Sequence, residues 1–600
     1  MRRWIGLWIL GLGVLAATGC GYFNLQKSSN LPLLKVTENK VFQFAAPWDQ
    51  GMFDGFYKQT KAAPDIGMVK GGVVPHHLLA GYMPATFFNH LSKQKPSLIV
   101  LIGPNHFDTG KKPIISSFRD WQTPYGTLQT DQSLVKKLLA EDLISVDEET
   151  MKGEHSINSL TSFISKSLPN AKVVSLILKY KTPTSTLNLL VENLEKNLPD
   201  DAVVVASVDF SHYMTWPVAD FHDELSKQVI KNFDYSRIDN LEIDSPASVY
   251  TLLKLMEYYG IQKIGYELHD NAAQLMNDPS LEETTSHYSP YFINGEKSTD
   301  KVASLLFFGD MMLDRNVKKQ IDTYGPDWIF EKLAGKENRF FSGVDLISAN
   351  LEGPFADKRR PTSKSIAFRF DPILIPTLKK FNFSLFSQAN NHSYDMGNDG
   401  FIESKNNLTK AGLDFYGSQY RIDDSSMIIK TVGDYKIAFI GINDTNSPVD
   451  TVAVDALVKS GKTRADFVIM NVHWGAEYKE ISNNNQRQLA HEFIDAGVDI
   501  IVGHHPHVIQ EIEIYKNRPI FYSLGNFIFD QYFSTTTQQG LAVGLILKDK
   551  EISVSVFPLA ETKSQPYLML FENATTSMYN IISRSRLGDN KFQNFNLKLN

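Results

Sequence analysis

The chain of 600 residues contains a single cysteine, at position 20. One cysteine excludes intrachain disulfides, so hydrophobic cores must stabilise the folded parts. Positive charge is not in excess either, because 60 Lys and Arg residues face 67 Asp and Glu residues and the formal net charge is −7. This balance, together with the absence of a basic stripe, argues against nucleic acid as a partner.

Long apolar runs are scarce as well. Residues 4–17 form an apolar run after Arg2 and Arg3, and this run is too short for a comfortable membrane span. It ends on Thr18-Gly19-Cys20, which resembles the bacterial lipobox, although Ala17 stands where leucine is commoner. We therefore expect residues 1–20 to be a lipoprotein signal peptide. The resemblance implies lipid on Cys20 and an extracytoplasmic protein anchored to the cell membrane.

What is present is typical of a folded protein with two domains. Hydrophobic residues make up 42% of the chain and charged residues 21%, and the length is too great for one core. We expect a tether and edge segment over residues 21–64, a first domain over 65–297, a short charged linker, a second domain over 301–560 and a C-terminal extension over 561–600.

Strand-like runs in the first domain end in polar clusters. Runs near residues 71–75, 97–102 and 202–206 lead to His76, to His106, and to Asp209 with His212, while Glu154-His155 begins a helical stretch. Helical stretches lie between these strands, near residues 131–139 and 186–198. Such βαβ alternation predicts an α/β fold with a largely parallel sheet, whose ligands lie beyond the carboxyl ends of the strands.

These clusters resemble the Memo family (the AmmeMemoRadiSam system protein B group) through VVPHH, LIGPNHF, EHSIN and SVDFSHY, in that order. The resemblance implies a fold like that of the extradiol dioxygenases, with His76 and His106 as ligands of iron or copper. Glu154, His155, Asp209 and His212 would line the same pocket. Family members can supply a cysteine ligand late in the domain, and this chain has none to offer there. Asp270 is a candidate third ligand. A vestigial pocket of hydrogen-bonded histidines is the alternative.

The second domain repeats the pattern with more polar strand ends. Residues 466–530 read as three apolar strands that end at His473, at the cluster 503–507 and at Asn526, with a helix from residue 487 to 496 between the first two and Gly497 as its C-cap. Earlier runs end at Asp310, at Asn350 and Glu352, and at Asn391-His392. Carboxylates, amides and imidazoles are ligands of divalent metals. We therefore expect one metal site with His392 at its rim.

This series resembles the capsule-synthesis proteins associated with poly-γ-glutamate, within the calcineurin-like metallophosphoesterase superfamily. The motifs are FFGDMMLDR, SANLEGPF, QANNHSYDMG, VHWG, GHHPHV and YSLGNF. The resemblance implies an αββα sandwich that binds manganese, iron or zinc, with His392 as the catalytic imidazole. Met312 stands where the superfamily has a second histidine ligand, and His504 where it has glycine. The metal ligands that the resemblance implies are Asp310, Asn350 or Glu352, Asn391, His473, His505 and His507.

Together these patterns predict a surface lipoprotein whose second domain is a metal-dependent hydrolase or transferase. It would act in the synthesis, processing or export of an anionic envelope polymer, with such a polymer or a small molecule as substrate and capsule-synthesis membrane proteins as partners. Two alternatives stay open. One is a tethered scaffold without catalysis that binds a polymer or a partner. The other is a metal-dependent oxidoreductase that uses the first domain.

Overall fold

The computed structural model describes residues 41–600, apart from residues 63, 550, 594 and 600. The expected signal peptide, Cys20 and most of the expected tether lie outside the described residues. Residues 42–600 form one compact unit. Within the described part of the chain, no helix combines the length and the apolar character needed to cross a membrane.

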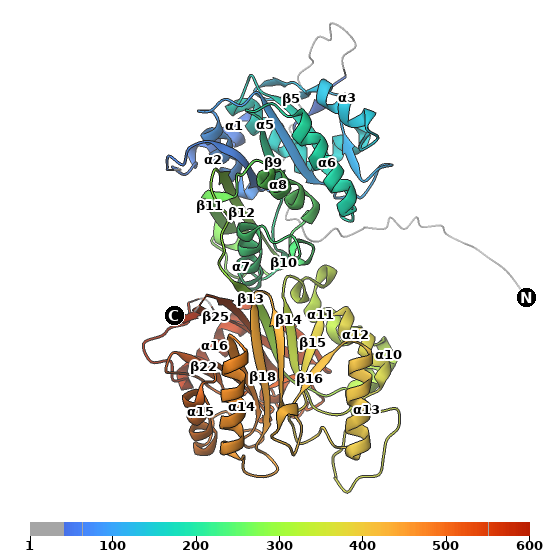
Figure 1. Ribbon diagram of the computed structural model, residues 1–600, viewed down its shortest axis with the longest axis vertical. Coiled ribbons are helices and arrows are strands. Elements are labelled where there is room, and N and C mark those ends of the chain that lie inside the picture. The colour runs from blue at the N-terminus through green and yellow to red at the C-terminus, as the bar shows by residue number, and fades with distance from the viewer. Residues whose placement is uncertain (1–40, 63, 550, 594, 600) are drawn as a thin grey trace, which may run out of the picture. The chain divides into compact units, whose positions relative to one another are not determined.

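The first part of the chain forms a mixed sheet with a parallel centre (Figure 1). Its central strands consist mostly of buried valine, leucine and isoleucine, as expected for a parallel sheet covered on both faces. Antiparallel strands flank this centre on both sides. In order across the sheet, the strands are β10 (His212–Met214), β12 (Thr284–Ile293), β2 (Val69–Val74), β9 (Val203–Ser207), β3 (Leu98–Pro104), β8 (Lys172–Leu178), β4 (Ile114–Ser116) and β7 (Ser145–Val146), with β11 (Lys263–Asn271) paired to β12.

Helices cover both faces of this sheet. Ile99 and Leu101 of β3 belong to one apolar core, and Val100 and Ile102 belong to the other, because successive side chains of a strand point to opposite faces. The first core also contains Phe53 of α1, so this part of the structure begins before residue 65. The helices of the first core are α1 (Gln50–Lys58), α2 (Tyr82–Leu91) and α5 (His155–Ser167), and those of the second are α3 (Gln132–Ala140), α6 (Thr184–Asn197), α7 (Trp216–Asn232) and α8 (Pro246–Tyr258).

The second part of the chain contains two sheets that share an apolar core. Leu305 and Leu545 come from one sheet and Phe439 and Ile469 from the other. The first sheet has the order β16 (Asp414–Tyr416), β15 (Phe383–Ser387), β14 (Leu346–Leu351), β13 (Val302–Met311), β24 (Gln539–Lys548), β25 (Glu551–Thr562) and β26 (Gln565–Leu568). The second has the order β17 (Met427–Val432), β18 (Tyr435–Asn443), β19 (Phe467–His473), β20 (Ile500–His504), β22 (Arg518–Phe521) and β21 (Ile512–Tyr515).

Helices cover the outer faces of this pair of sheets (Figure 1). Leu457 and Phe493 pack with Met470 of the second sheet, and Phe330 and Leu378 pack with Phe308 of the first. The result is the predicted layer order of helices, sheet, sheet and helices. The outer helices are α10 (Arg315–Tyr324), α11 (Trp328–Ala334), α12 (Ile375–Lys380), α13 (Gly397–Lys410), α14 (Thr451–Arg464) and α15 (Asn484–Ala496). Gly497, with a φ of 121°, caps α15 as expected.

The apolar run over residues 519–530 does not form the predicted strand that ends at Asn526, because Asn526 begins a further strand. It begins in β22 of the second sheet and then forms β23 (Asn526–Ile528), which pairs with β13 of the first. The chain turns between them at Gly525, with a φ of 71°. A Cβ at Gly309 would lie 2.0 Å from the Gly525 carbonyl oxygen, so glycine permits this close approach next to Asp310. Apolar composition alone does not distinguish a strand from two short strands in different sheets.

The C-terminal residues continue the first of these two sheets. The expected boundary after residue 560 falls inside β25, and β27 (Asn596–Leu599) pairs with β25 over residues 552–555. Between them, α16 (Phe571–Arg584) contributes Met578 and Ile581 to the core between the two sheets. The expected C-terminal extension therefore contributes helix α16 and strand β27 to this part of the fold.

Candidate metal centres

Three parallel strands of the first sheet bring acidic, amide and imidazole side chains to one edge. Asp310 lies near the end of β13, Glu352 follows β14 directly, and Asn391-His392 follow β15. These strands are neighbours and parallel, so their carboxyl ends coincide. The side chains of Asp310 and Glu352 are fully buried.

The second sheet delivers histidines to the same place. His473 ends β19, and His505 and His507 follow β20. His505 and His507 have φ values of 97° and 58°, which are uncommon for residues other than glycine. Backbone strain of this kind persists where the surrounding structure holds the residue in place, and it concentrates at functional sites.

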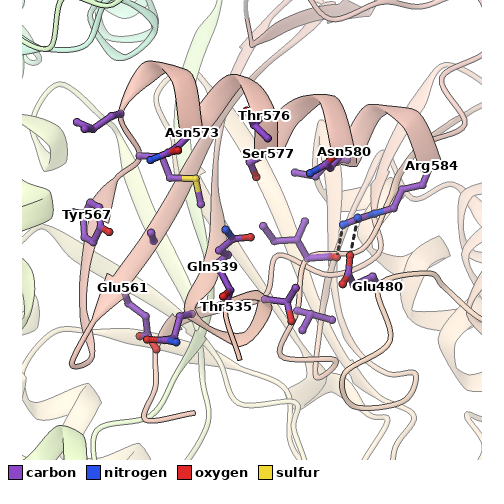
Figure 2. Close-up of a pocket in the computed structure, with 18 residues that line it drawn as sticks. Glu480, Thr535, Gln539, Glu561, Tyr567, Asn573, Thr576, Ser577, Asn580 and Arg584 are labelled. Carbon is purple, nitrogen blue, oxygen red and sulfur yellow. Dashed lines mark hydrogen bonds and ion pairs between the residues drawn. The ribbon is translucent and has the colours of Figure 1, made fainter. Parts of the chain in front are cut away.

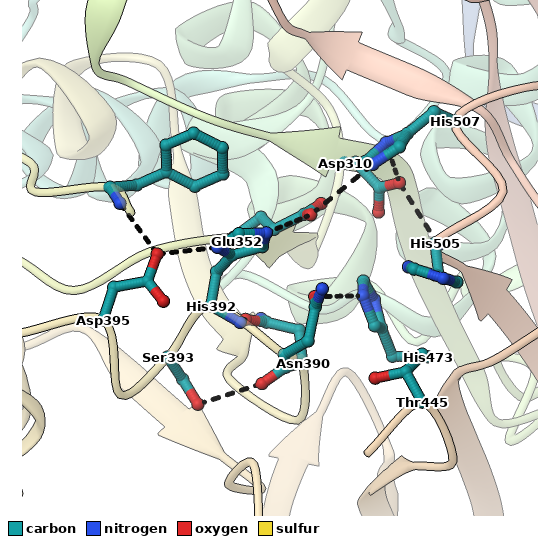
Figure 3. A network of polar contacts seen from close by, with 12 residues as sticks. Asp310, Glu352, Asn390, His392, Ser393, Asp395, Thr445, His473, His505 and His507 are labelled. Atoms are coloured by element: carbon teal, nitrogen blue, oxygen red, sulfur yellow. Dashed lines mark hydrogen bonds and ion pairs between the residues drawn. The ribbon is translucent and has the colours of Figure 1, made fainter. Parts of the chain in front are cut away.

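The two sets of side chains form one network (Figure 3). Asp310 Oδ2 lies 3.1 Å from His507 Nδ1 and accepts a hydrogen bond of 3.2 Å from the His505 N–H. His507 Nε2 lies 3.7 Å from Glu352 Oε1, and Asn391 Oδ1 lies 2.9 Å from His473 Nε2. The expected ligands Asp310, Glu352 and His507 have ligand atoms within 4.8 Å of one another, a spacing that suits one cation.

The buried Glu352 carboxylate is a site where a cation would be stabilising. Neither of its carboxylate oxygens has a hydrogen-bonding partner among the described residues. Burial, together with the charge of Asp310, raises the pKa of Glu352 well above its ordinary range, although His507 opposes this shift. A buried carboxylate without a partner is costly unless a cation neutralises it. The donor set of carboxylates, imidazoles and an amide therefore fits a divalent metal.

His392 faces this cluster and is held from behind by an acid. Its Nε2 lies 3.9 Å from Glu352 Oε1, and its Nδ1 lies 2.6 Å from Asp395 Oδ2. Burial lowers the pKa of His392, and the hydrogen bond with Asp395 opposes that effect. The pairing makes Nδ1 the protonated nitrogen, which leaves Nε2 to exchange a proton inside the site.

A second cluster lies at the carboxyl ends of β2 and β3 in the first part of the chain. His76 Nε2 is 3.2 Å from Asp209 Oδ2 and 3.3 Å from Asp244 Oδ2, and His106 Nε2 is 3.8 Å from the same Asp244 oxygen. The ring of His155 stacks on that of His106 with their centroids 4.0 Å apart. The ring nitrogens of His76, His106 and His155 lie within 4.8 Å of one another.

Glu154 orients one of these rings. It is the N-cap of α5, where its carboxylate accepts from the Ser156 N–H (3.0 Å), and its Oε1 lies 2.6 Å from His106 Nδ1. Burial alone would raise the pKa of Glu154, but the bond with His106 brings it down to about 2. His106 is therefore fixed with Nε2 toward His76 and Asp244, an arrangement common among metal-binding histidines.

Comparison with known proteins identifies both parts of the chain. Residues 304–531 match the family described as bacterial capsule synthesis protein PGA_cap, and residues 52–267 match the family described as Memo-like protein. The PGA biosynthesis protein CapA of Bacillus subtilis (strain 168) is 33% identical over 285 residues, which cover 45% of this chain and 74% of that protein. The chain belongs to the bacterial capsule synthesis family.

Further relatives support both assignments. The capsule biosynthesis protein CapA of Bacillus anthracis is 32% identical over 286 residues, covering 44% of this chain and 68% of that protein. A MEMO1 family protein of Metallosphaera sedula is 27% identical over 241 residues, covering 38% of this chain and 78% of that protein. A Memo-like region thus precedes a capsule synthesis region in one chain.

One expected ligand of the capsule synthesis region, Asn350, has other contacts, and Met312 does not fill the place of the absent histidine. Asn350, named as the alternative to Glu352, donates from Nδ2 to Asp310 Oδ1 (2.8 Å) and accepts from Asn390 Nδ2 (3.0 Å). These bonds orient the Asp310 carboxylate and leave Glu352 as the group that needs a cation. Met312 lies in the apolar core, and its sulfur accepts from the Asp314 N–H, so it does not substitute for a ligand.

His504 lies behind the site, as expected. Its Nδ1 is 3.4 Å from Asp310 Oδ1 and its Nε2 is 3.0 Å from Asn471 Nδ2.

The sequence analysis missed two acids of the capsule synthesis site. Asp395 follows His392 by three residues within a motif that was already singled out, so its spacing could have revealed the pair. Glu477 groups with His505 and His507 in the structure, and it follows Trp474 closely in the chain. An exposed acid in a loop carries no signal that separates it from other surface acids.

In the Memo-like site, the carboxylate that lies near the two histidines is not the one that was predicted. Asp270 accepts a hydrogen bond from the Tyr82 hydroxyl and does not join the group around His76, so its proposal as third ligand is wrong. Asp244 occupies that place instead, with Asp209 beside it. His212 joins no group of three ligand side chains within the described residues, and its N–H donates to Glu242. No local pattern marks Asp244, because only the fold brings it to the histidines.

Proposed function

We propose that the capsule synthesis region is a metal-dependent hydrolase or transferase that acts on an envelope polymer resembling poly-γ-glutamate. One observation carries the proposal: among the described residues the buried Glu352 carboxylate has no hydrogen-bonding partner, and the His507 and His392 imidazoles lie 3.7 and 3.9 Å from it. The printed description of the Bacillus subtilis relative, PGA biosynthesis, supports this substrate class.

The chain's own residues would perform distinct tasks. Asp310, Glu352 and His507 would hold the metal on one side, and Asn391, His473 and His505 would complete its surroundings. A manganese, iron or zinc ion bound there would polarise a phosphoryl or amide oxygen of the substrate. His392 would protonate the leaving group from Nε2, while Asp395 keeps the ring in the required orientation.

The test measures hydrolysis by the full-length protein with manganese, iron or zinc, on phosphoester and γ-glutamyl amide substrates. His473→Ala is expected to abolish metal-dependent activity and to leave the circular dichroism spectrum unchanged. The matched control is His491→Ala, which removes a half-buried histidine of α15 that pairs with Glu513 away from the proposed metal ligands. If wild type hydrolyses neither substrate and His473→Ala still supports capsule formation in cells, a tethered scaffold without catalysis replaces the enzyme.

The position of Asp244 beside His76 and His106 favours a second function, metal binding in the Memo-like pocket. We infer that the Memo-like pocket binds iron through His76, His106 and Asp244, because two imidazoles and one carboxylate form a ligand set suited to non-haem iron. The metal content of protein purified without chelators tests this inference. Asp244→Ala should lower bound iron at least tenfold, whereas Asp239→Ala, which removes an exposed acid, should not. Equal iron in both variants would exclude Asp244 as a ligand.

Localisation remains part of the proposal. The leader and Cys20 support a lipoprotein on the outer face of the cell membrane, where an envelope polymer is accessible. Capsule-synthesis membrane proteins would be its neighbours there.

A further inference from the structure

A cavity of about 510 Å³ lies under helix α16, outside both candidate metal centres. Strand β25 and the loop over residues 531–538 form its floor, and the helix covers it (Figure 2). Its volume falls within the range of about 300–1,000 Å³ that small-molecule sites occupy.

Amides and hydroxyls from one face of α16 line this cavity. Asn573, Ser577, Asn580 and Arg584 recur at spacings of three to four residues, which places them on the same side of the helix. Figure 2 shows them above Gln539. Asn573 and Asn580 are exposed and Gln539 is half-buried, and within the described residues none of these three side-chain amides makes a hydrogen bond. They therefore offer both donors and acceptors to a ligand.

Within the described residues, one carboxyl oxygen of a buried acid at one end of the cavity has no hydrogen-bonding partner. Glu561 is 6% exposed, and its Oε2 accepts from the Phe529 N–H at 3.2 Å. Its Oε1 is buried and has no partner among the described residues. Burial raises the pKa of Glu561 to about 8, so the group is mostly protonated at neutral pH and can donate as well as accept. A buried polar atom without a partner is costly, and a ligand hydroxyl or amide would satisfy it.

Charge identifies the class of ligand. Arg584 is the cavity's cation, and it pairs with Glu480 at 2.9 Å at the end opposite Glu561 (Figure 2). The same guanidinium donates to the Ile509 carbonyl oxygen at 2.8 Å. Among the lining residues there is no second cation to bind a polyanion, and the protonated Glu561 adds no charge. A neutral ligand rich in hydroxyl and amide groups matches this lining.

We propose that this cavity binds a neutral saccharide that carries hydroxyl and acetamido groups. Tyr567 adds an aromatic ring to the lining, with Lys332 Nζ 3.7 Å from the ring centroid, and Met569 and Ile581 add apolar surface. Asn573, Asn580 and Gln539 bind the hydroxyl and amide groups. Glu561 binds one further group at the buried end.

The cavity shares its loops with the metal centre of the capsule synthesis region. Val508 and Ile509 line the cavity directly after His507, and Glu480 lies three residues after Glu477. A saccharide in the cavity would therefore hold a longer envelope chain close to the centre. Binding itself requires no metal, so it can be tested separately from the proposed activity.

The experiment titrates full-length protein with tri-N-acetylchitotriose by isothermal calorimetry, in the presence of EDTA. A glutamate oligomer with γ-linkages is the second probe. The double variant Asn573→Ala/Asn580→Ala is expected to weaken saccharide binding about tenfold, since each lost hydrogen bond contributes about 0.5–1.5 kcal/mol. Glu572→Ala/Thr575→Ala changes two exposed residues of the same helix outside the lining and is the matched control.

Each outcome decides the proposal. Saccharide binding that persists in His473→Ala and weakens only in the lining variant supports it, and this result would stand even if the metal-dependent activity were absent. Three results would overturn the proposal. In the first the wild type binds no saccharide, in the second the lining variant binds it as well as its control does, and in the third the protein binds the glutamate oligomer more tightly. Proper folding of each variant is checked by an unchanged melting temperature.

Discussion

His392 and Asp395, three residues apart in the loop after β15, pair directly: Nδ1 of the ring lies 2.6 Å from Oδ2 of the acid. Asp395 is itself fixed, because it accepts from the Phe368 N–H at 2.7 Å and from Lys364 Nζ at 2.6 Å. The imidazole therefore has one orientation, and its Nε2 faces Glu352. This fixed orientation suits the proposed role of His392 as a proton donor.

Asp395→Asn should lower kcat about 100-fold and leave metal content unchanged. The amide keeps the shape of the acid but no longer favours a proton on His392 Nδ1, so Nε2 is not presented in the required state. Steady-state kinetics with metal analysis measures both effects. Asp399→Asn, an exposed acid at the start of α13, is the control. An unchanged kcat would remove His392 from the mechanism.

Asp244→Cys should change which metal the Memo-like pocket prefers. A thiolate is a softer ligand than a carboxylate, so zinc or copper should replace iron as the main metal in protein purified without chelators. Elemental analysis of wild type and variant, grown in the same medium, measures the ratio. Identical metal ratios in the two proteins would show that Asp244 lies outside the coordination sphere.

Glu561→Gln should flatten the dependence of stability on pH. The folded-state pKa of Glu561 is about 8, above the ordinary value of 4.5, so the native state holds its proton more tightly than the unfolded chain does. Its contribution to stability is therefore full below about pH 4.5 and is lost as the pH rises toward 8. The shift corresponds to at most about 5 kcal/mol.

Melting curves at pH 5 and pH 8.5 measure this effect. Wild type should lose more melting temperature between these pH values than Glu561→Gln does. Glu572→Gln alters an exposed acid of α16 and should behave like wild type. A wild-type loss equal to that of Glu561→Gln would contradict the raised pKa.

Cys20→Ala should release the protein from membranes or leave an uncleaved precursor, because the lipid has no sulfur to attach to. Fractionation and N-terminal sequencing of the mature protein measure the outcome. Position 20 lies outside the described residues, so this prediction depends on the sequence alone. Unchanged partitioning with an unchanged mature N-terminus would argue against a lipid anchor.

Local patterns in the sequence predicted much of the fold. Apolar runs of strand length predicted β3, β9 and β19 close to their observed bounds, because strands buried on both faces require such runs. The same reasoning failed over residues 519–530, where one apolar run forms strands in two sheets. The apolar composition of a strand indicates that it is buried, but it does not indicate which other strand it pairs with.

The sequence by itself determined which strand ends carry carboxylate, amide and imidazole side chains, since a polar residue after an apolar run is a local feature. Only the tertiary structure decided which of them act together. It gave Glu352 an environment without a partner, placed Asp395 behind His392, and brought Asp244 rather than Asp270 to His76 and His106. The physical reason is that these relationships join distant segments or depend on burial. Distance and desolvation are set by packing, which no local pattern encodes.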